Sequence, residues 1–298
     1  MSVTVLLDFS LDATMAPLLY GVQQGYFAEQ GIDLKVVPST GSNVALPEID
    51  SKKFDFAFIN MSSIITDKIQ NGSPLVGVST WENYASFAIA SLTPINSLSD
   101  LVGKDFGTVA FSSGRQNFPL VLQANGVDPT KVPIKLLDFS VLYQALFAGT
   151  IQTAETGLPG SGDTLKVQAD KLGKTIYMYP FSKWGFIDYN KVLVTRTDVV
   201  QSNSDLVTRM VKAVNMSMAQ ALANMTDAQA VALIAAVNPQ ADPAATTAAW
   251  EDFKTLTKNS GPFDPAQVAT IFDRTVSQGK LTTTLQATDF YTNQFQGQ

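Results

Sequence analysis

Three short polar segments contain residue types that suit binding of a small molecule. Asp8-Phe9 follows an apolar run, and a ring beside a carboxylate can stack on a flat ligand while the carboxylate accepts amine or amide protons. Ser112-Ser113-Gly114-Arg115 offers hydroxyls, close backbone approach and a guanidinium at a helix start, which suits a carboxylate, sulfonate or phosphate. Glu155 follows another apolar run and suits an amino-bearing ligand. These segments predict a ligand-binding site.

Other candidates lie where the chain leaves predicted strands or passes between predicted domains. The full set of predicted ligand contacts is Asp8, Phe9, Met15, Asn60, Met61, Trp81, Ser112, Ser113, Gly114, Arg115, Glu155, Trp184 and Asp188. Each also has a structural explanation, because polar residues cap helices or fix loops, and aromatic rings more often pack in a core or a hinge than on a ligand.

Catalysis has few residues to use in this sequence. It contains no histidine and no cysteine, so the commonest acid–base side chain, thiolate nucleophiles and the commonest transition-metal ligands are all missing. Neither G-x-G-x-x-G nor a Walker A loop occurs, and the carboxylates are scattered. We therefore expect no enzymatic activity, no catalytic residues, no cofactor and no metal.

Composition narrows the class of partner. The 298 residues are enough for two domains, and a net charge of −6 argues against nucleic acid or an anionic membrane surface. Apolar runs are too short to span a membrane. Met1-Ser2 leads directly into the first strand, so we expect no signal peptide or lipid anchor within this sequence.

Apolar runs alternate with helical patterns along most of the chain. Strands are expected near residues 1–7, 33–38, 54–59, 75–80, 86–92, 106–111, 134–139, 151–156, 174–179 and 192–195, and helices near 17–27, 44–51, 64–70, 117–125, 141–147, 166–172 and 205–225. The last hundred residues are expected to be mostly helical and to cover the first domain. This alternation predicts mostly parallel sheets flanked by helices, with ligand-binding loops at the carboxyl ends of the strands.

The order of residues in the opening segment resembles one family. It reads Leu7-Asp8-Phe9, Ala16-Pro17, Gly25-Tyr26-Phe27 and Gly31-Ile32-Asp33-Leu34. This order is similar to that of solute-binding proteins of ABC importers for taurine, alkanesulfonates, nitrate and the pyrimidine precursors of thiamine.

The resemblance implies an α/β fold of the type II periplasmic-binding-protein class, with two lobes and two crossover hinge segments. Lobe I would comprise residues 1–86 and 191–298, and lobe II residues 87–190. A small-molecule ligand would bind between the lobes by hinge closure. The partners would be the membrane subunits of an ABC importer, and we expect an extracytoplasmic or periplasmic monomer.

Some residues depart from the family's pattern. In the pyrimidine-precursor binders, Trp, Asn and His usually stand where this chain has Phe9, Asp12 and Met15. The ligand therefore stays open between a heteroaromatic, pyrimidine-like molecule and an aromatic or organic anion. Two alternatives from other classes are a thiamine-pyrimidine biosynthetic enzyme, which would need the missing histidine and cysteines, and the effector-binding domain of a transcription regulator, which would need a DNA-binding motif before the first strand.

Overall fold

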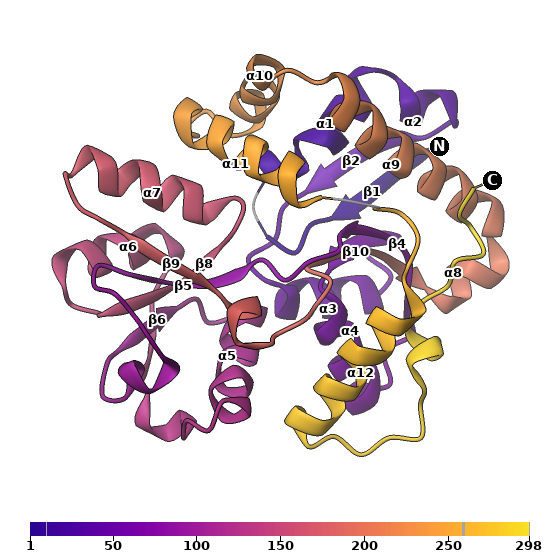
Figure 1. The fold of residues 1–298 in the computed structure, drawn as a ribbon. Coiled ribbons are helices and arrows are strands. Elements are labelled where there is room, and N and C mark those ends of the chain that lie inside the picture. Colours follow the sequence, from indigo (N-terminus) through magenta and orange to yellow (C-terminus); the bar gives the residue numbers. More distant parts are fainter. Residues whose placement is uncertain (10, 258–259, 298) are drawn as a thin grey trace.

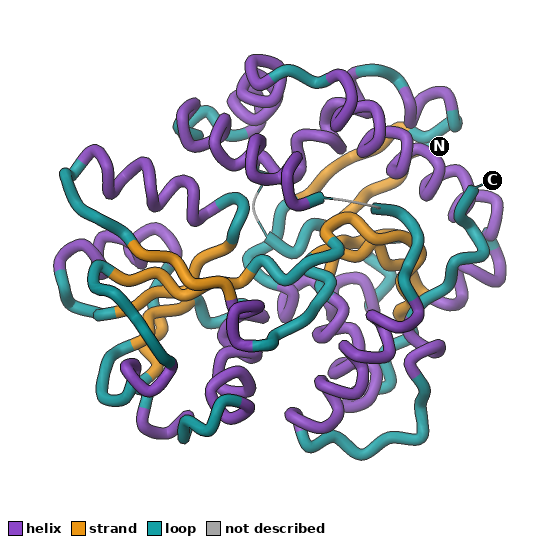
Figure 2. The backbone as a smooth tube through the Cα atoms, in the orientation of Figure 1, coloured by secondary structure: helices purple, strands orange, loops and turns teal. Residues whose placement is uncertain are grey.

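Two β-sheets, each flanked by helices, form two lobes in the computed structural model, which describes residues 1–9, 11–257 and 260–297 (Figure 1; Figure 2). The first sheet has the strand order β2-β1-β3-β10-β4, and the second has the order β7-β6-β8-β5-β9. The strands of the first sheet are β1 (Ser2–Leu6), β2 (Asp33–Val37), β3 (Phe56–Ile59), β4 (Leu75–Glu82) and β10 (Lys191–Arg196). Those of the second are β5 (Phe87–Ser91), β6 (Phe106–Thr108), β7 (Ile134–Leu136), β8 (Thr153–Gly157) and β9 (Tyr177–Pro180).

Each sheet contains one strand that opposes the direction of the others. β10 pairs antiparallel with both β3 and β4, whereas β1 pairs parallel with β2 and β3. β5 likewise pairs antiparallel with β8 and β9, whereas β6 pairs parallel with β7 and β8. The two opposing strands are those that directly follow the chain crossings between the sheets. The two-lobed α/β architecture is confirmed, and the sheets expected to be mostly parallel are mixed, with four of the five strands of each running in the same direction.

The helices cover both faces of each sheet. Around the first sheet lie α1 (Ala16–Gln23), α2 (Tyr26–Glu29), α3 (Ser42–Asp50), α4 (Met61–Asn71), α8 (Thr197–Ser202), α9 (Ser204–Asn224), α10 (Asp227–Val237), α11 (Pro243–Leu256) and α12 (Pro265–Gly279). Around the second lie α5 (Ser113–Ala124), α6 (Phe139–Ala148) and α7 (Ser161–Lys171). Short 3₁₀ segments occupy Ala13–Met15, Leu98–Leu101, Pro129–Lys131, Phe181–Trp184 and Ala287–Phe290. Among the described residues, no helix has both the length and the apolar character needed to cross a membrane.

Alternating side chains of the strands form a separate apolar core on each face of a sheet. Val5 and Phe58 lie in the core beneath α1, α9 and α11, whereas Leu6 and Ile59 lie in the core beneath α3, α4 and α12. The second sheet is packed in the same way, with Ile89 on one face and the neighbouring Ala90 on the other. Burial on both faces explains why these strands read as nearly continuous apolar runs.

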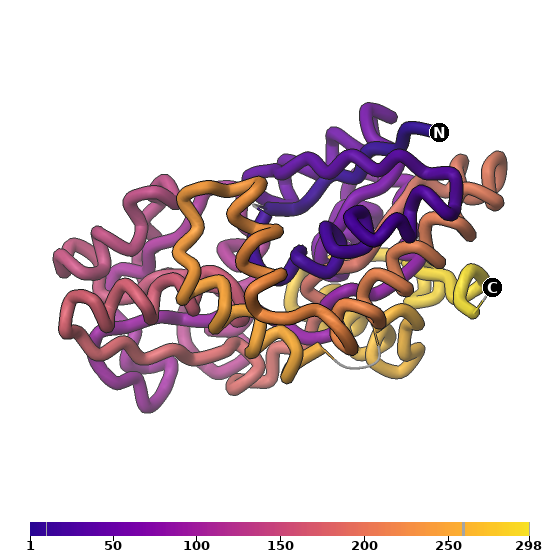
Figure 3. The backbone as a smooth tube through the Cα atoms, turned by 90° about the horizontal axis from the view of Figure 1, so that it is seen from above, coloured from indigo at the N-terminus to yellow at the C-terminus, as the bar shows by residue number. Residues whose placement is uncertain are grey.

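The C-terminal helices pack mainly on the first lobe, as the sequence predicts. α9 contacts α1 and β4, and α12 contacts α4. Figure 3 shows that both chain ends lie at the side of the molecule away from the second lobe. The first sheet takes strands from residues 2–82 and 191–196, and the second from residues 87–180. The exact lobe boundaries at residues 86/87 and 190/191 stay a prediction.

Some element bounds differ from those expected. The helix expected over 17–27 is two helices, because Gly25 adopts a left-handed φ of 85° that an α-helix does not allow. The strand expected over 106–111 ends at Thr108, and α5 begins at Ser113 rather than near residue 117. The strand and the helix are thus joined by a loop of residues 109–112 at the carboxyl end of β6, where the second lobe faces the first.

Candidate functional site

A cleft of about 550 Å³ lies between the lobes and is lined by side chains of both. Asp8 and Phe9 follow β1, and Lys191 begins β10, so these residues form the wall from the first lobe. The wall from the second lobe follows the carboxyl ends of β6 and β7 and includes β8 itself; its residues include Ser112, Ser113, Phe139, Tyr143 and Glu155. This is the edge at which open α/β sheets bind ligands.

A buried ion pair supports the wall from the first lobe. Lys191 Nζ donates to Glu82 Oε1 at 2.6 Å and to Thr14 Oγ1 at 3.1 Å. Glu82 Oε2 also accepts a hydrogen bond from Asn190. Burial lowers the pKa of Lys191, but the charges of Glu82 and Asp8 outweigh it and hold that pKa above its ordinary value. Lys191 therefore lines the cleft as a cation that is already paired with Glu82.

Asp8 is the carboxylate of this wall with unused hydrogen-bonding capacity. Its Oδ1 is buried and has no hydrogen-bond partner among the described residues. Burial raises its pKa from 3.8 to about 7, with Lys191 acting in the opposite direction and Glu82 and Asp12 raising it further. A buried acceptor without a partner is costly unless a bound molecule supplies the donor.

Glu155 forms the corresponding acidic centre of the second lobe. It is 8% exposed, and its two carboxylate oxygens accept hydrogen bonds from the hydroxyls of Thr108 and Ser112. Burial raises the pKa of Glu155, and those two hydrogen bonds oppose the rise. Gly114 allows this placement, because a Cβ at Gly114 would collide with Glu155 Oε1.

Aromatic rings from both lobes meet in the cleft. Phe9 of the first lobe contacts Phe139 of the second edge to face, with ring centroids 5.2 Å apart. Phe139 in turn contacts Tyr143 at 5.6 Å, and the Tyr143 hydroxyl lies 2.8 Å from Thr156 Oγ1. The cleft thus combines flat apolar surfaces with carboxylates, which is the usual composition of a small-molecule site.

The structure brings five of the thirteen predicted ligand contacts to the cleft. These are Asp8, Phe9, Ser112, Ser113 and Glu155. The other eight do not line it: Met15, Asn60, Met61, Trp81, Gly114, Arg115, Trp184 and Asp188.

Some of those eight residues have clear packing roles. Met15 and Met61 are fully buried in the two cores of the first lobe. Trp81 is also buried, contacts Phe58 edge to face, and donates from Nε1 to the carbonyl of Thr14 at 3.0 Å. Trp184 lies partly buried against Tyr179, with ring centroids 6.0 Å apart.

Asn60 and Asp188 belong to a buried polar cluster where the chain returns from the second lobe. Asp188 accepts from the Ser62 backbone at 3.1 Å, from the Ser62 hydroxyl and from Asn60 Nδ2 at 3.1 Å. Arg274 of α12 lies 4.0 Å from Asp188, and Asn117 of α5 donates to Ser62 Oγ at 3.3 Å. This cluster ties the crossover to both lobes instead of facing the ligand cleft.

Arg115 turns away from the cleft. Its guanidinium donates to the carbonyl of Ala110 at 3.1 Å. At about 100° per residue, Arg115 lies about 200° around α5 from Ser113, so the two side chains leave opposite sides of the helix. The anion cradle expected at residues 112–115 therefore lacks its guanidinium.

Sequence reasoning missed Phe139, Tyr143 and Lys191. Phe139 follows β7, and residues that follow a parallel strand lie at the edge of the sheet where ligands bind. Lys191 carried a different signal, because a lysine directly before the apolar run of a central strand needs a buried partner or a site.

Two α/β lobes joined by two crossovers around a ligand-sized cleft define the periplasmic-binding-protein fold. Solved structures support this class. The periplasmic aliphatic sulphonate binding protein SsuA of Escherichia coli matches with a TM-score of 0.73 at 13% identity, covering 97% of this chain and 91% of that one. The alkanesulfonate-binding protein SsuA of Xanthomonas axonopodis pv. citri, bound to MOPS, matches with a TM-score of 0.70 at 14% identity, covering 98% of each chain.

A third structure has the same fold. The zinc-bound ligand-binding component of an ABC-type import system from Staphylococcus aureus matches with a TM-score of 0.71 at 15% identity, covering 99% of this chain and 97% of that one. No curated protein sequence matches the chain. A family model described as NMT1/THI5 like matches residues 12–228, and the chain belongs to this family.

Proposed function

We propose that the protein is a solute receptor of an ABC-type importer, which binds a small organic molecule between its lobes and presents the closed form to the membrane subunits. We place it outside the cytoplasm and expect it to act as a monomer without catalysis. The structural neighbours include periplasmic sulfonate-binding proteins and a component of an ABC-type import system, which supports this role.

One observation carries the proposal: the cleft of about 550 Å³ has walls from both lobes, and in the described part of the chain two crossings join their sheets. A ligand that contacts both walls gains interactions that exist only when the lobes are together. Closure is then a shift of population toward the state to which the ligand binds more tightly. The cleft volume suits a small organic molecule.

The side chains of the cleft support a ligand with a flat ring and polar groups. Phe9, Phe139 and Tyr143 offer aromatic surfaces, and Asp8 and Glu155 offer acceptors. The sequence leaves two ligand classes open, a heteroaromatic molecule and an organic anion. The missing histidine and cysteine weigh against the alternative of a thiamine-pyrimidine biosynthetic enzyme.

Ligand-dependent closure tests the receptor role. Because the chain has no cysteine, two cysteines introduced at exposed Val22 and Leu172 would carry a donor and an acceptor dye, one on each lobe. We expect energy transfer to rise when the low-molecular-mass fraction of yeast extract is added. The matched control places both dyes on the first lobe, at Val22 and Val237, where transfer should stay constant. An unchanged signal from the first pair would contradict the receptor role.

A further inference from the structure

The N-terminus of α5 is where an organic anion would be expected to bind in this cleft. Backbone N–H groups at the start of a helix and the hydroxyls of residues 112 and 113 would be its donors. Here the chain's own Glu155 occupies that position. Ser112 Oγ donates to Glu155 Oε1, Thr108 Oγ1 donates to Glu155 Oε2, and Gly114 N donates to Ser112 Oγ at 3.0 Å.

Glycine at position 114 is what makes room for this internal carboxylate. Any Cβ there would collide with Glu155 Oε1, and it would also come within 2.8 Å of the Phe87 ring. The carboxyl group of Glu155 therefore lies against the first turn of α5, where the partial positive charge of the helix end favours its ionised form. A second anion placed there would meet a carboxylate instead of free donors.

The charged side chains of the cleft that form no ion pair are acidic. Both lysines of the cleft already have acidic partners, since Lys191 pairs with Glu82 and Lys171 pairs with Asp242. Within the described part of the chain, Asp8, Asp12 and Glu155 form no ion pair with a basic side chain, and no arginine lines the cleft. Three acidic residues thus remain without a basic partner.

We propose that this cleft binds a small aromatic cation of the amidine or guanidine kind and rejects organic anions, because Glu155 fills the anion position at α5 and Asp8 offers a buried free acceptor on the opposite wall. The inference rests on the proposed receptor function and names its ligand class. A flat cation would donate to Asp8 and Glu155, while its ring and charge lie against the faces of Phe9, Phe139 and Tyr143.

Benzamidine and benzoate form a matched pair of probes, because they share ring and shape and differ in the sign of the charge. Calorimetry on the whole chain should detect benzamidine binding and no benzoate binding. Glu155→Gln keeps the size of the side chain and should weaken benzamidine binding at least tenfold. The matched control Glu29→Gln changes the same residue type at an exposed position of α2 and should leave the affinity unchanged.

Two results would overturn the inference. One is binding of benzoate or benzenesulfonate at least as tightly as benzamidine, and the other is no binding of benzamidine at millimolar concentration. Glu155→Gln should retain the wild-type thermal unfolding profile, which separates loss of the site from loss of the fold. Closure with yeast extract but not with benzamidine would disprove the ligand class and leave the receptor function intact, whereas failure of both would disprove the receptor function.

Discussion

At the scale of single residues, Lys191 and Glu82 form a buried salt bridge in the wall of the cleft. Glu82 is 1% exposed, so its charge depends on Lys191 and Asn190 for stabilisation. Removing one member of a buried pair leaves an uncompensated charge, which is more costly than removing both. Replacing one residue of the pair should therefore lower the free energy of unfolding more than replacing both.

Lys191→Met tests this pair. We expect it to lower the free energy of unfolding by about 3–5 kcal/mol, the typical cost of an isolated buried charge. The double variant Lys191→Met with Glu82→Gln should recover most of that loss, because neither charge is then left alone. Urea unfolding of the two single variants and the double variant checks the coupling, and additive losses would contradict it.

Asp8 should make ligand affinity depend on pH. Its pKa of about 7 results first from burial, and the charged groups facing it are Lys191 of β10, Glu82 of β4 and Asp12 of its own loop. Benzamidine should bind more tightly as the pH rises through 7, because Asp8 becomes an anion. Calorimetry from pH 5.5 to 8.5 measures the change. Asp8→Asn should flatten the profile, and an equally steep profile in that variant would assign the titration to another group.

The raised pKa of Asp8 should also make stability depend on pH, but stability should fall as the pH rises, whereas ligand affinity should increase. Between about pH 4 and pH 7 the folded chain holds a proton on Asp8 that the unfolded chain has already lost. This contribution to the free energy of unfolding is full at low pH and is lost as the pH rises toward 7. Relative to the wild type, Asp8→Asn should therefore become more stable across that range. Urea unfolding at pH 4.5 and pH 8 gives the comparison, and a difference that does not change with pH would refute the assignment.

The sequence predicts where the cleft lies, at the carboxyl ends of the strands, better than it predicts which side chains line the cleft. Asp8 and Phe9 lie in the cleft because they follow β1 at the edge where the lobes face each other, and Glu155 lies there within β8. Met15 and Arg115 lie in the same loops or helix starts, yet one packs into a core and the other turns to Ala110. Some side chains of a loop face the cleft and others face away from it. The three-dimensional path of the backbone decides which side chains face the cleft.

At the scale of elements, helix α11 begins with a residue that has two separate roles. Asp242 accepts from the backbone N–H of Ala244 at 2.9 Å and of Ala245 at 3.3 Å, and so caps the helix. Its other oxygen pairs with Lys171 of α7, which lies on the opposite lobe. Two substitutions can separate the cap from the ion pair.

Asp242→Ala removes both roles, whereas Asp242→Asn keeps the capping oxygen and removes the charge. We expect the alanine variant to lose about 1 kcal/mol of unfolding free energy. The asparagine variant should lose at most about 0.5 kcal/mol, because an exposed ion pair contributes little. Urea unfolding of both variants checks this, and equal losses would show that the ion pair is the larger contribution.

Elements were predictable because buried strands leave short apolar runs and helices leave periodic patterns of apolar residues. All ten expected strands are present, and β1, β2 and β4 lie within two residues of their expected bounds. The antiparallel pairing of β5 and β10 has no such pattern, since a buried strand reads the same in either direction. Strand direction follows from where the chain crosses between sheets, a long-range property that local residue types do not encode.

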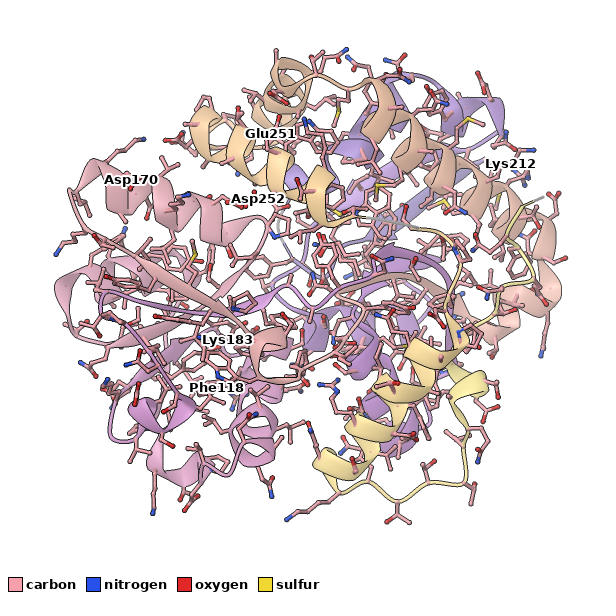
Figure 4. All side chains as sticks on the ribbon, viewed as in Figure 1. Phe118, Asp170, Lys183, Lys212, Glu251 and Asp252 are labelled. Carbon is pink, nitrogen blue, oxygen red and sulfur yellow. The ribbon has the colours of Figure 1, made fainter. Side chains whose placement is uncertain are left out.

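At the scale of the whole molecule, side chains of the two lobes contact each other directly around the cleft. Phe9 contacts Phe139, and Lys171 pairs with Asp242 where α7 approaches α11. Asp252 of α11 also interacts with Asp163 of α7, and burial together with this second carboxylate raises the pKa of Asp163 to about 6. In Figure 4, Asp252 lies on the part of α11 that approaches α7, the helix that carries Asp170. The contact between these helices thus contains an attractive pair and a repulsive one.

Lys171→Gln should shift the balance toward separated lobes. The ion pair with Asp242 forms across the lobes, so its loss removes stabilisation from the closed state alone. An exposed pair of this kind contributes at most about 0.5 kcal/mol, so we expect the ligand affinity to fall by no more than about twofold. The matched control Lys174→Gln changes an exposed lysine of the same lobe. Energy transfer between dyes at Val22 and Leu172 measures the separation of the lobes directly. The difference in affinity between the Lys171→Gln and Lys174→Gln variants should shrink in 1 M salt, where charges are screened within about 3 Å. A difference that persists there would mean that Lys171 acts through packing, and equal affinities of the two variants in low salt would show that the lobes close without this pair.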